Sequence, residues 1–291
     1  MKNLMLGFLM CVTMLILSVS ASAYTLKFQD WGFNPSGGLT PSISPIDEMT
    51  LLGITLNNST PNSTYPNNGT FINFSTIQAQ SFQNNGGMVT GTGLGNTFEI
   101  TMIMNGTGSY SRNAANLNDL VFNTATLDIY IDNTLNYRTT TGLFGANDGT
   151  KIASFTLVEG IGLMNYYNPT AGNPHGSTDI LFESTYIKSG YWFDKLGIDL
   201  STYDLDMVVG LSDSNNTVIR NVSDTTKDEF YESGLTWNAD DDSENYKTFM
   251  STNGSFAPTI SPVPEPATML LLGLGLIGLS GISRSKAKGY K

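Results

Sequence analysis

Between residues 24 and 252, apolar and polar side chains alternate with a period of two, and this alternation constrains the fold more than any other feature. In the segment 126–132, Leu127, Ile129 and Ile131 share one face, and the residues between them share the other. A strand with one buried face has this pattern. Similar runs rich in Val, Ile, Phe, Tyr and Thr predict further strands at 24–28, 49–56, 70–82, 97–105, 152–159, 177–187 and 203–211.

Turn-forming residues separate these segments. Pairs that tolerate a positive φ predict turns at 68–69, 85–87, 105–106, 148–149 and 253–254. Helical periodicity is lacking, and only residues 226–233 favour a turn or two of helix. Strands that do not alternate with helices favour an all-β fold, namely an antiparallel β-sandwich or a jelly-roll-like single domain.

The first 23 residues differ from the rest of the chain. Lys2 is followed by an apolar stretch at 4–19 and then by Ala21-Ser22-Ala23, which is the order of a secretory signal peptide cleaved after Ala23. A retained N-terminal anchor is the alternative. Cys11, the only cysteine, lies in this stretch, so the mature chain has no disulfide and no cysteine ligand or nucleophile.

The other end has an apolar stretch of its own. Residues 267–282 carry no charge, and a helix of that length spans about 24 Å, somewhat less than a hydrocarbon core of about 30 Å. Arg284, Lys286, Lys288 and Lys291 follow and favour a cytoplasmic end. Four glycines weaken the helix, which favours a temporary membrane stop over the alternative of a permanent anchor.

A proline motif precedes this stretch. In Val263-Pro264-Glu265-Pro266, the two prolines restrain the backbone to an extended form, which leaves an exposed strip just outside the membrane. The motif, the Leu- and Gly-rich helix and the basic end, in this order over 263–291, resemble the PEP-CTERM sorting signal. The resemblance implies a Gram-negative host that makes extracellular polysaccharide and processing at the motif by the membrane transpeptidase exosortase. It also implies a transient inner-membrane intermediate and then delivery to the cell surface or extracellular matrix.

These features divide the chain into four parts. We predict a signal peptide at 1–23, an extracellular β domain at 24–252, a linker at 253–262 and the sorting signal at 263–291. Between the two end signals, nine basic and 24 acidic side chains give a net charge of about −15. Such a surface repels nucleic acid, so we expect no nucleic-acid partner.

Candidates for catalysis are few. His175 is the only histidine and lacks a Gly-x-Ser-x-Gly elbow, and a single histidine without cysteines does not make an ordinary zinc site. The carboxylates between Asp194 and Asp206 could supply the pair that a glycosidase needs, and the aromatic residues at 166–167 and 191–193 could stack on sugars. The simpler interpretation makes the carboxylates solvated and Trp192 and Phe193 core residues. We therefore predict no enzymatic activity, with a glycoside hydrolase as the alternative.

The segment 237–245 is acidic. Asp240, Asp242 and Glu244 occupy alternate positions, as the first oxygen ligands of a calcium loop do. Ser243 and Phe249 stand where an EF-hand requires glycine and glutamate, so an EF-hand is excluded. We predict a hydrated loop and no cofactor, with a looser calcium site as the alternative.

A second resemblance concerns the β domain itself. Residues 126–132 (TLDIYID), 145–157 and 189–200 are similar to the flocculation-associated group of PEP-CTERM proteins. The similarity implies a role in biofilm or floc formation, with extracellular polysaccharide or neighbouring cells as the partner. A secreted carbohydrate-binding module is a further alternative.

Overall fold

The computed structural model describes residues 26–27, 29–61, 68–113, 117–139, 142–164, 175–202, 207–218, 224–231 and 247–260. Lys27–Ile260 forms one compact unit. The predicted signal peptide and sorting signal lie outside the described residues.

Within the described part, the strands outnumber the helices and pair in antiparallel fashion, so the predicted all-β, antiparallel class is confirmed. The strands are β1 Leu26–Lys27, β2 Trp31–Phe33, β3 Ile43–Ile46, β4 Glu48–Pro61, β5 Asn68–Asn84, β6 Gly87–Met88, β7 Glu99–Arg112, β8 Asn118–Asp132, β9 Thr150–Met164, β10 His175–Ile187, β11 Trp192–Phe193, β12 Met207–Val218 and β13 Lys247–Ile260. The helices are η1 Leu143–Gly145, η2 Leu200–Thr202 and α2 Asp224–Tyr231. The last of these confirms the short helix expected at 226–233.

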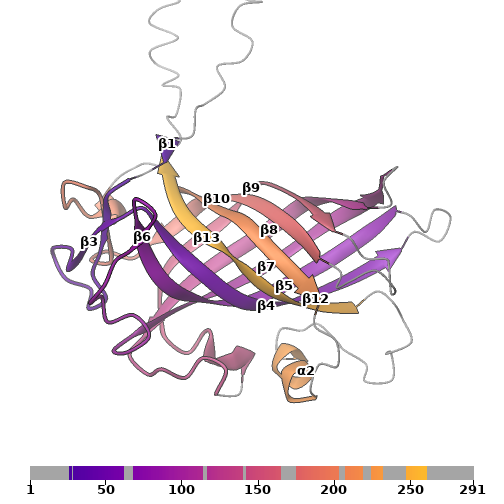
Figure 1. Cartoon of the computed structure of the whole chain (residues 1–291), viewed down its shortest axis with the longest axis horizontal. Coiled ribbons are helices and arrows are strands. Elements are labelled where there is room, and N and C mark those ends of the chain that lie inside the picture. The colour runs from indigo at the N-terminus through magenta and orange to yellow at the C-terminus, as the bar shows by residue number, and fades with distance from the viewer. Residues whose placement is uncertain are drawn as a thin grey trace, which may run out of the picture. The chain divides into compact units, whose positions relative to one another are not determined.

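Eight long strands form one sheet that closes on itself (Figure 1). Their order is β4-β5-β7-β8-β9-β10-β12-β13, and β13 pairs in turn with β4, from Lys247 opposite Asn58 to Phe256 opposite Met49. The predicted sandwich or jelly roll is therefore wrong. A sandwich and a closed sheet both bury one face of each strand, so the period of two does not distinguish them.

Long strands also explain three of the predicted turns that do not form, and the first of these pairs, 68–69, begins β5 and pairs with Ser111 and Tyr110 of β7. The pairs at 105–106 and 253–254 lie inside β7 and β13, and residues 253–260 of the predicted linker belong to β13. Glycine within a strand accommodates close backbone approach: a Cβ on Gly106 would lie 3.2 Å from both Ala125 and Phe122. The turn at 85–87 does form, with Asn85 at φ 49° and Gly86 at φ 75° between β5 and β6.

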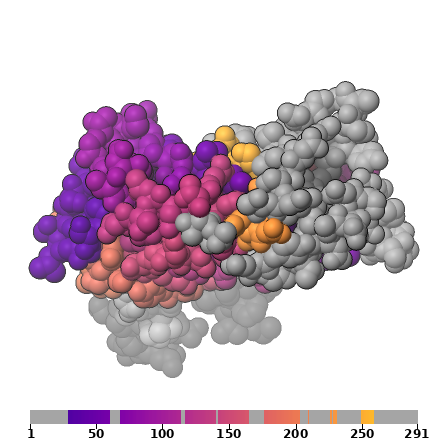
Figure 2. All heavy atoms as spheres, turned by 90° about the horizontal axis from the view of Figure 1, so that it is seen from below, coloured from indigo at the N-terminus to yellow at the C-terminus, as the bar shows by residue number. Residues whose placement is uncertain are grey.

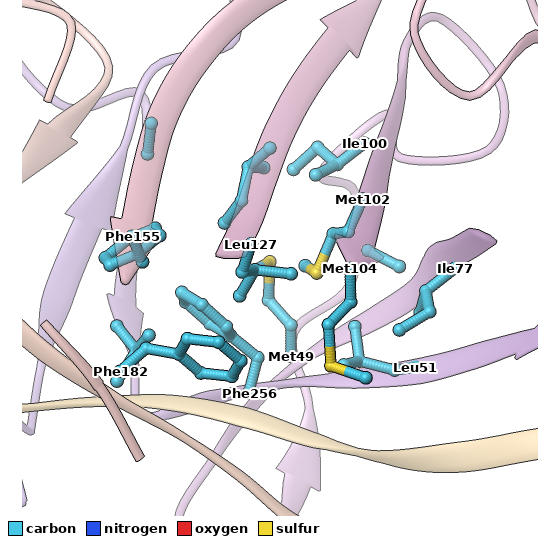
Figure 3. Close-up of a cluster of buried hydrophobic side chains, with 14 of the residues drawn as sticks. Met49, Leu51, Ile77, Ile100, Met102, Met104, Leu127, Phe155, Phe182 and Phe256 are labelled. Carbon is cyan, nitrogen blue, oxygen red and sulfur yellow. The ribbon is translucent and has the colours of Figure 1, made fainter. Parts of the chain in front are cut away.

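Apolar side chains fill the interior of the closed sheet (Figure 3). Leu127, Ile129 and Ile131 are buried as the alternation predicts, whereas Asp128 and Tyr130 between them are half-buried and Thr126 before them is exposed. The side chains drawn in Figure 3 come from strands far apart in the sequence and meet in one cluster; they include Met49, Leu51, Ile77, Met102, Met104, Leu127, Phe155, Phe182 and Phe256.

A small second sheet, β11-β2-β3, adds a layer of aromatic rings to this cluster. Trp31, Phe33 and Trp192 are each 0% exposed. The Trp192 ring lies 5.1 Å from that of Phe33, 5.6 Å from that of Trp31 and 6.0 Å from that of Phe256 of β13. The short sheet is thus held to the large one by aromatic packing.

A separate apolar cluster packs on the outer face of the closed sheet. The ring of Phe230, on α2, lies 5.6 Å from that of Phe74 of β5 and 5.8 Å from that of Phe144 of η1. Seen from below, two elements lie on the surface of the molecule (Figure 2): α2, and the loop between β8 and β9, which contains η1. Outward-facing positions of the sheet are therefore apolar where these elements cover them.

Candidate functional site

The predicted carboxylate group is divided between structural roles. Asp194 Oδ1 accepts hydrogen bonds from the backbone N–H groups of Leu196 and Ile198, both at 2.8 Å. Asp199 Oδ2 accepts from Ser189 Oγ at 2.6 Å and from the N–H of Gly190 at 2.7 Å, and its Oδ1 accepts from the N–H of Ser201 at 2.9 Å. Both side chains shape the segment 189–202. Asp204 and Asp206 lie outside the described residues.

The lowered pKa of Asp199 is consistent with this structural role. Burial raises the pKa of this carboxyl, but the hydrogen bonds from Ser189, Ser201 and Gly190 outweigh burial and leave the pKa below its ordinary value. The folded state therefore favours the ionised form. Its stabilising contribution is complete above the unfolded pKa and is lost as the pH falls through the folded one.

Asp199→Asn is accordingly expected to lower the free energy of unfolding at pH 7 by about 1–2 kcal/mol, because an amide NH₂ replaces an oxygen that accepts two hydrogen bonds. The difference from wild type should shrink as the pH falls through the lowered pKa of folded Asp199, where the wild-type carboxyl also becomes protonated. Urea unfolding at pH 7 and pH 3 measures it. Exposed Asp228→Asn is the control, and an equal loss at both pH values would contradict this role for Asp199.

Among the described residues, the aromatic side chains considered for stacking on sugars do not form an exposed surface. Trp192 and Phe193 are each 0% exposed, which confirms the interpretation of both as core residues. Tyr191 is half-buried, with its ring 6.4 Å from that of Phe33 and the Lys188 ammonium 5.8 Å from its centre. Residues 166–167 lie outside the described part.

The remaining predicted residues give no site within the described chain. His175 begins β10, opposite Thr217 of β12. Asp240, Asp242 and Glu244 lie outside the described residues. Among the residues that are described, no three acidic, histidine or cysteine side chains are placed to hold a metal ion. Nor does any described helix have both the length and the apolar character to cross a membrane.

Two buried glutamates anchor the outer cluster. Burial raises the pKa of Glu99, and hydrogen bonds from the N–H groups of Asn136 and Tyr137 and from Gln78 oppose the shift. Glu229 of α2 accepts from the N–H of Phe144 at 2.8 Å. Both carboxylates satisfy backbone donors of the loop between β8 and β9, so their burial has a structural cause.

A hollow of about 320 Å³ lies over β7, β8 and β9. A bulge accompanies it: Thr107 pairs with Thr124 and Gly108 with Phe122, so Asn123 has no partner residue on β7. The two threonine hydroxyls are hydrogen-bonded at 2.7 Å. The lining consists of Asn105, Gly106, Thr107, Asn123, Thr124, Ala125, Thr126, Thr156 and Leu157.

An ion pair lies farther along the same strands. Lys151 Nζ contacts Asp128 Oδ2 at 2.7 Å, and Ser154 Oγ donates to Asp128 Oδ1 at 2.6 Å. The hydrogen bond to Asp128 raises the pKa of Lys151. The two charges offset one another, which leaves the neighbouring hollow between neutral side chains.

Sequence reasoning did not find this hollow. Asn105-Gly106 suggested a turn, and the sequence Asn123-Thr124-Ala125-Thr126 resembles an ordinary strand edge. The residues meet only because the register of three strands brings them together.

The C-terminal residues were compared with known families. Residues 262–285 match the PEP-CTERM protein-sorting motif, and this range includes Val263, Pro264, Glu265, Pro266 and Arg284. The chain thus carries a PEP-CTERM protein-sorting motif near its C-terminus. No curated protein and no solved structure matches the chain.

The PEP-CTERM motif implies an exported protein that exosortase processes at the membrane and that is delivered to the cell surface. The motif thus implies exosortase as the processing partner. Lys286, Lys288 and Lys291 follow the matched range, and the cleavage site after Ala23 remains a prediction.

Proposed function

We propose that this PEP-CTERM protein is a non-enzymatic component of the extracellular matrix, which strengthens biofilms or flocs by adhering to extracellular polysaccharide or neighbouring cells. The observation that supports this proposal most is the sorting motif at 262–285, attached to an antiparallel domain with a neutral, hydroxyl-rich hollow. The similarity to the flocculation-associated group points the same way.

Two features of the described domain agree with adhesion. Asp194 and Asp199 are engaged by the backbone of their own loop, so these two members of the expected carboxylate group already have structural partners. The net charge of about −15 between the two end signals keeps the protein dispersed and repels polyanions. An adhesive surface would then act through neutral polar contacts.

Loss of the gene is expected to reduce cell aggregation and the amount of retained matrix. Deleting only residues 263–291 should have the same effect, because the domain would no longer be sorted to the surface. Sedimentation of cell aggregates and the mass of bound polysaccharide measure both strains, with the restored gene as the control. Unchanged aggregation in both deletions would rule out the adhesive role.

We further propose that the protein needs no cofactor. The melting temperature should then be the same in a chelator and in millimolar calcium, because an ion that does not bind the folded state leaves the folding equilibrium unchanged. Thermal unfolding followed by circular dichroism measures it. If calcium raises the melting temperature of wild type but not that of Asp240→Asn/Asp242→Asn, the result would instead assign a calcium site to that segment.

A further inference from the structure

We propose that the hollow over β7, β8 and β9 binds a segment of a neutral glycan. The inference rests on the proposed adhesive function, since it names the surface that holds the polysaccharide and the chemical class of that polysaccharide.

The size of the hollow suits a short stretch of sugar. Small-molecule sites enclose roughly 300–1,000 Å³, and the volume of about 320 Å³ lies at the lower end of this range. The bulge at Asn123 supplies one wall, and the small residues Gly106 and Ala125 are part of the lining. A ligand of one or a few rings fits this space, whereas a protein interface requires a broader surface.

The polar groups of the hollow match those of a polyol. Thr107, Thr124, Thr126 and Thr156 each present a hydroxyl, which both donates and accepts hydrogen bonds. Asn105 and Asn123 add amide groups with the same two abilities. All six side chains are exposed, and the bond between Thr107 and Thr124 holds two hydroxyls in place. Sugar hydroxyls likewise donate and accept, so each can pair without a charged partner.

The lack of charged side chains in the hollow favours a neutral ligand. No ionisable side chain is among its lining residues. Asp128, two residues beyond Thr126 on β8, is already bonded to Lys151 and Ser154. An anionic glycan would gain no ion pair here and would meet a protein of net charge −11. A neutral glycan avoids this repulsion.

Exposed apolar side chains adjoin the hydroxyls. Val158 follows the lining residue Leu157 on β9 and is 49% exposed, and Ile72, opposite Thr107 on β5, is 38% exposed. The C–H face of a sugar ring gains by covering such groups, because apolar surface leaves water. Hydroxyls in the hollow and aliphatic groups beside it thus complement both kinds of surface on a sugar.

The test uses the full chain, purified in a detergent without a sugar headgroup and applied to an array of oligosaccharides. The array carries neutral oligomers of glucose, galactose, mannose and N-acetylglucosamine, together with oligomers of uronic acids. Wild type should bind at least one neutral series and no uronic-acid series. Thr107→Val/Thr124→Val should weaken that binding by about tenfold or more, because two hydrogen-bonding groups are lost.

The double substitution preserves shape and removes both partners of one hydrogen bond at an exposed position, so the melting temperature should stay near that of wild type. Thr185→Val, on β10 and outside the hollow, is the matched control and should bind as wild type does. Equal binding by the double variant and wild type would overturn the proposal. So would a preference for uronic acids, or the absence of binding to every neutral series.

The same variants separate this inference from the proposed function. If the double variant binds glycans and supports aggregation as well as wild type does, the hollow is not the site, although adhesion stands. If the gene deletion leaves aggregation unchanged but the hollow still binds neutral oligomers, the adhesive function fails and the site stands.

Discussion

Replacing Trp192 with alanine is expected to lower the free energy of unfolding by about 3–5 kcal/mol. The side chain is 0% exposed, and its ring packs against those of Trp31, Phe33 and Phe256. Its Nε1 also donates to the carbonyl of Ile152 at 3.3 Å. Alanine would leave a cavity between the small sheet and the large one and would remove this hydrogen bond, while the Ile152 carbonyl would still accept from the N–H of Lys188. Urea unfolding followed by far-ultraviolet circular dichroism measures the loss without relying on tryptophan emission.

Trp192→Phe provides a second, milder variant should the alanine variant fail to fold. It keeps an aromatic ring and loses the hydrogen bond, so its loss should be smaller. Leu196→Ala lies four residues away at a side chain that is 75% exposed and should change stability by less than about 0.5 kcal/mol. Equal effects of Trp192→Ala and Leu196→Ala would show that the small sheet contributes little to the fold.

Local patterns predicted the parts of the fold that depend on local chemistry. Leu127, Ile129 and Ile131 are buried because a strand places every second residue on one face. Trp192 and Phe193 were assigned to the core on similar grounds, and both are fully buried. Asn85 and Gly86 form the expected turn because they adopt positive φ readily.

Closure of the sheet depends on partners that no local pattern specifies. β4 and β13 pair between residues 49–58 and 247–256, and Thr55 Oγ1 lies 2.6 Å from Thr252 Oγ1 across that seam. Neither strand differs in its alternation from one in a sandwich. The pair Asn253-Gly254 even favoured a turn, because a residue that permits positive φ also permits a close approach between strands.

The candidate sites, like the closure of the sheet, depend on contacts that the sequence alone does not reveal. Asp194 and Asp199 were considered for catalysis because of their spacing, but the structure shows each bound to backbone donors that spacing does not reveal. The neutral hollow, in contrast, was not predicted, because nothing in the sequence links its lining residues. Thr107, Thr124 and Thr156 form no sequence motif, and only the pairing of three strands brings them together.

Pro264→Ala/Pro266→Ala is expected to abolish processing, so that the mature protein retains Lys291 and stays with the membrane fraction. These prolines lie within the matched sorting motif, and without them the backbone around Glu265 is free to continue the apolar helix that is expected to follow. Exosortase would then lose the extended segment on which it is expected to act. Intact mass spectrometry of the protein from the medium, the cell surface and the membrane fraction measures the outcome.

Ser261→Ala is the control, because it changes a residue directly before the matched range and should leave the processed mass as in wild type apart from the lost oxygen. Glu265→Gln separates charge from backbone restraint: it keeps both prolines and removes the single negative charge of the motif. Normal processing of this variant would assign recognition to the extended backbone, and failed processing would add the carboxylate. Wild-type mature protein that still carries Lys291 would contradict cleavage at the motif, and the C-terminal segment would then act as a lasting membrane anchor.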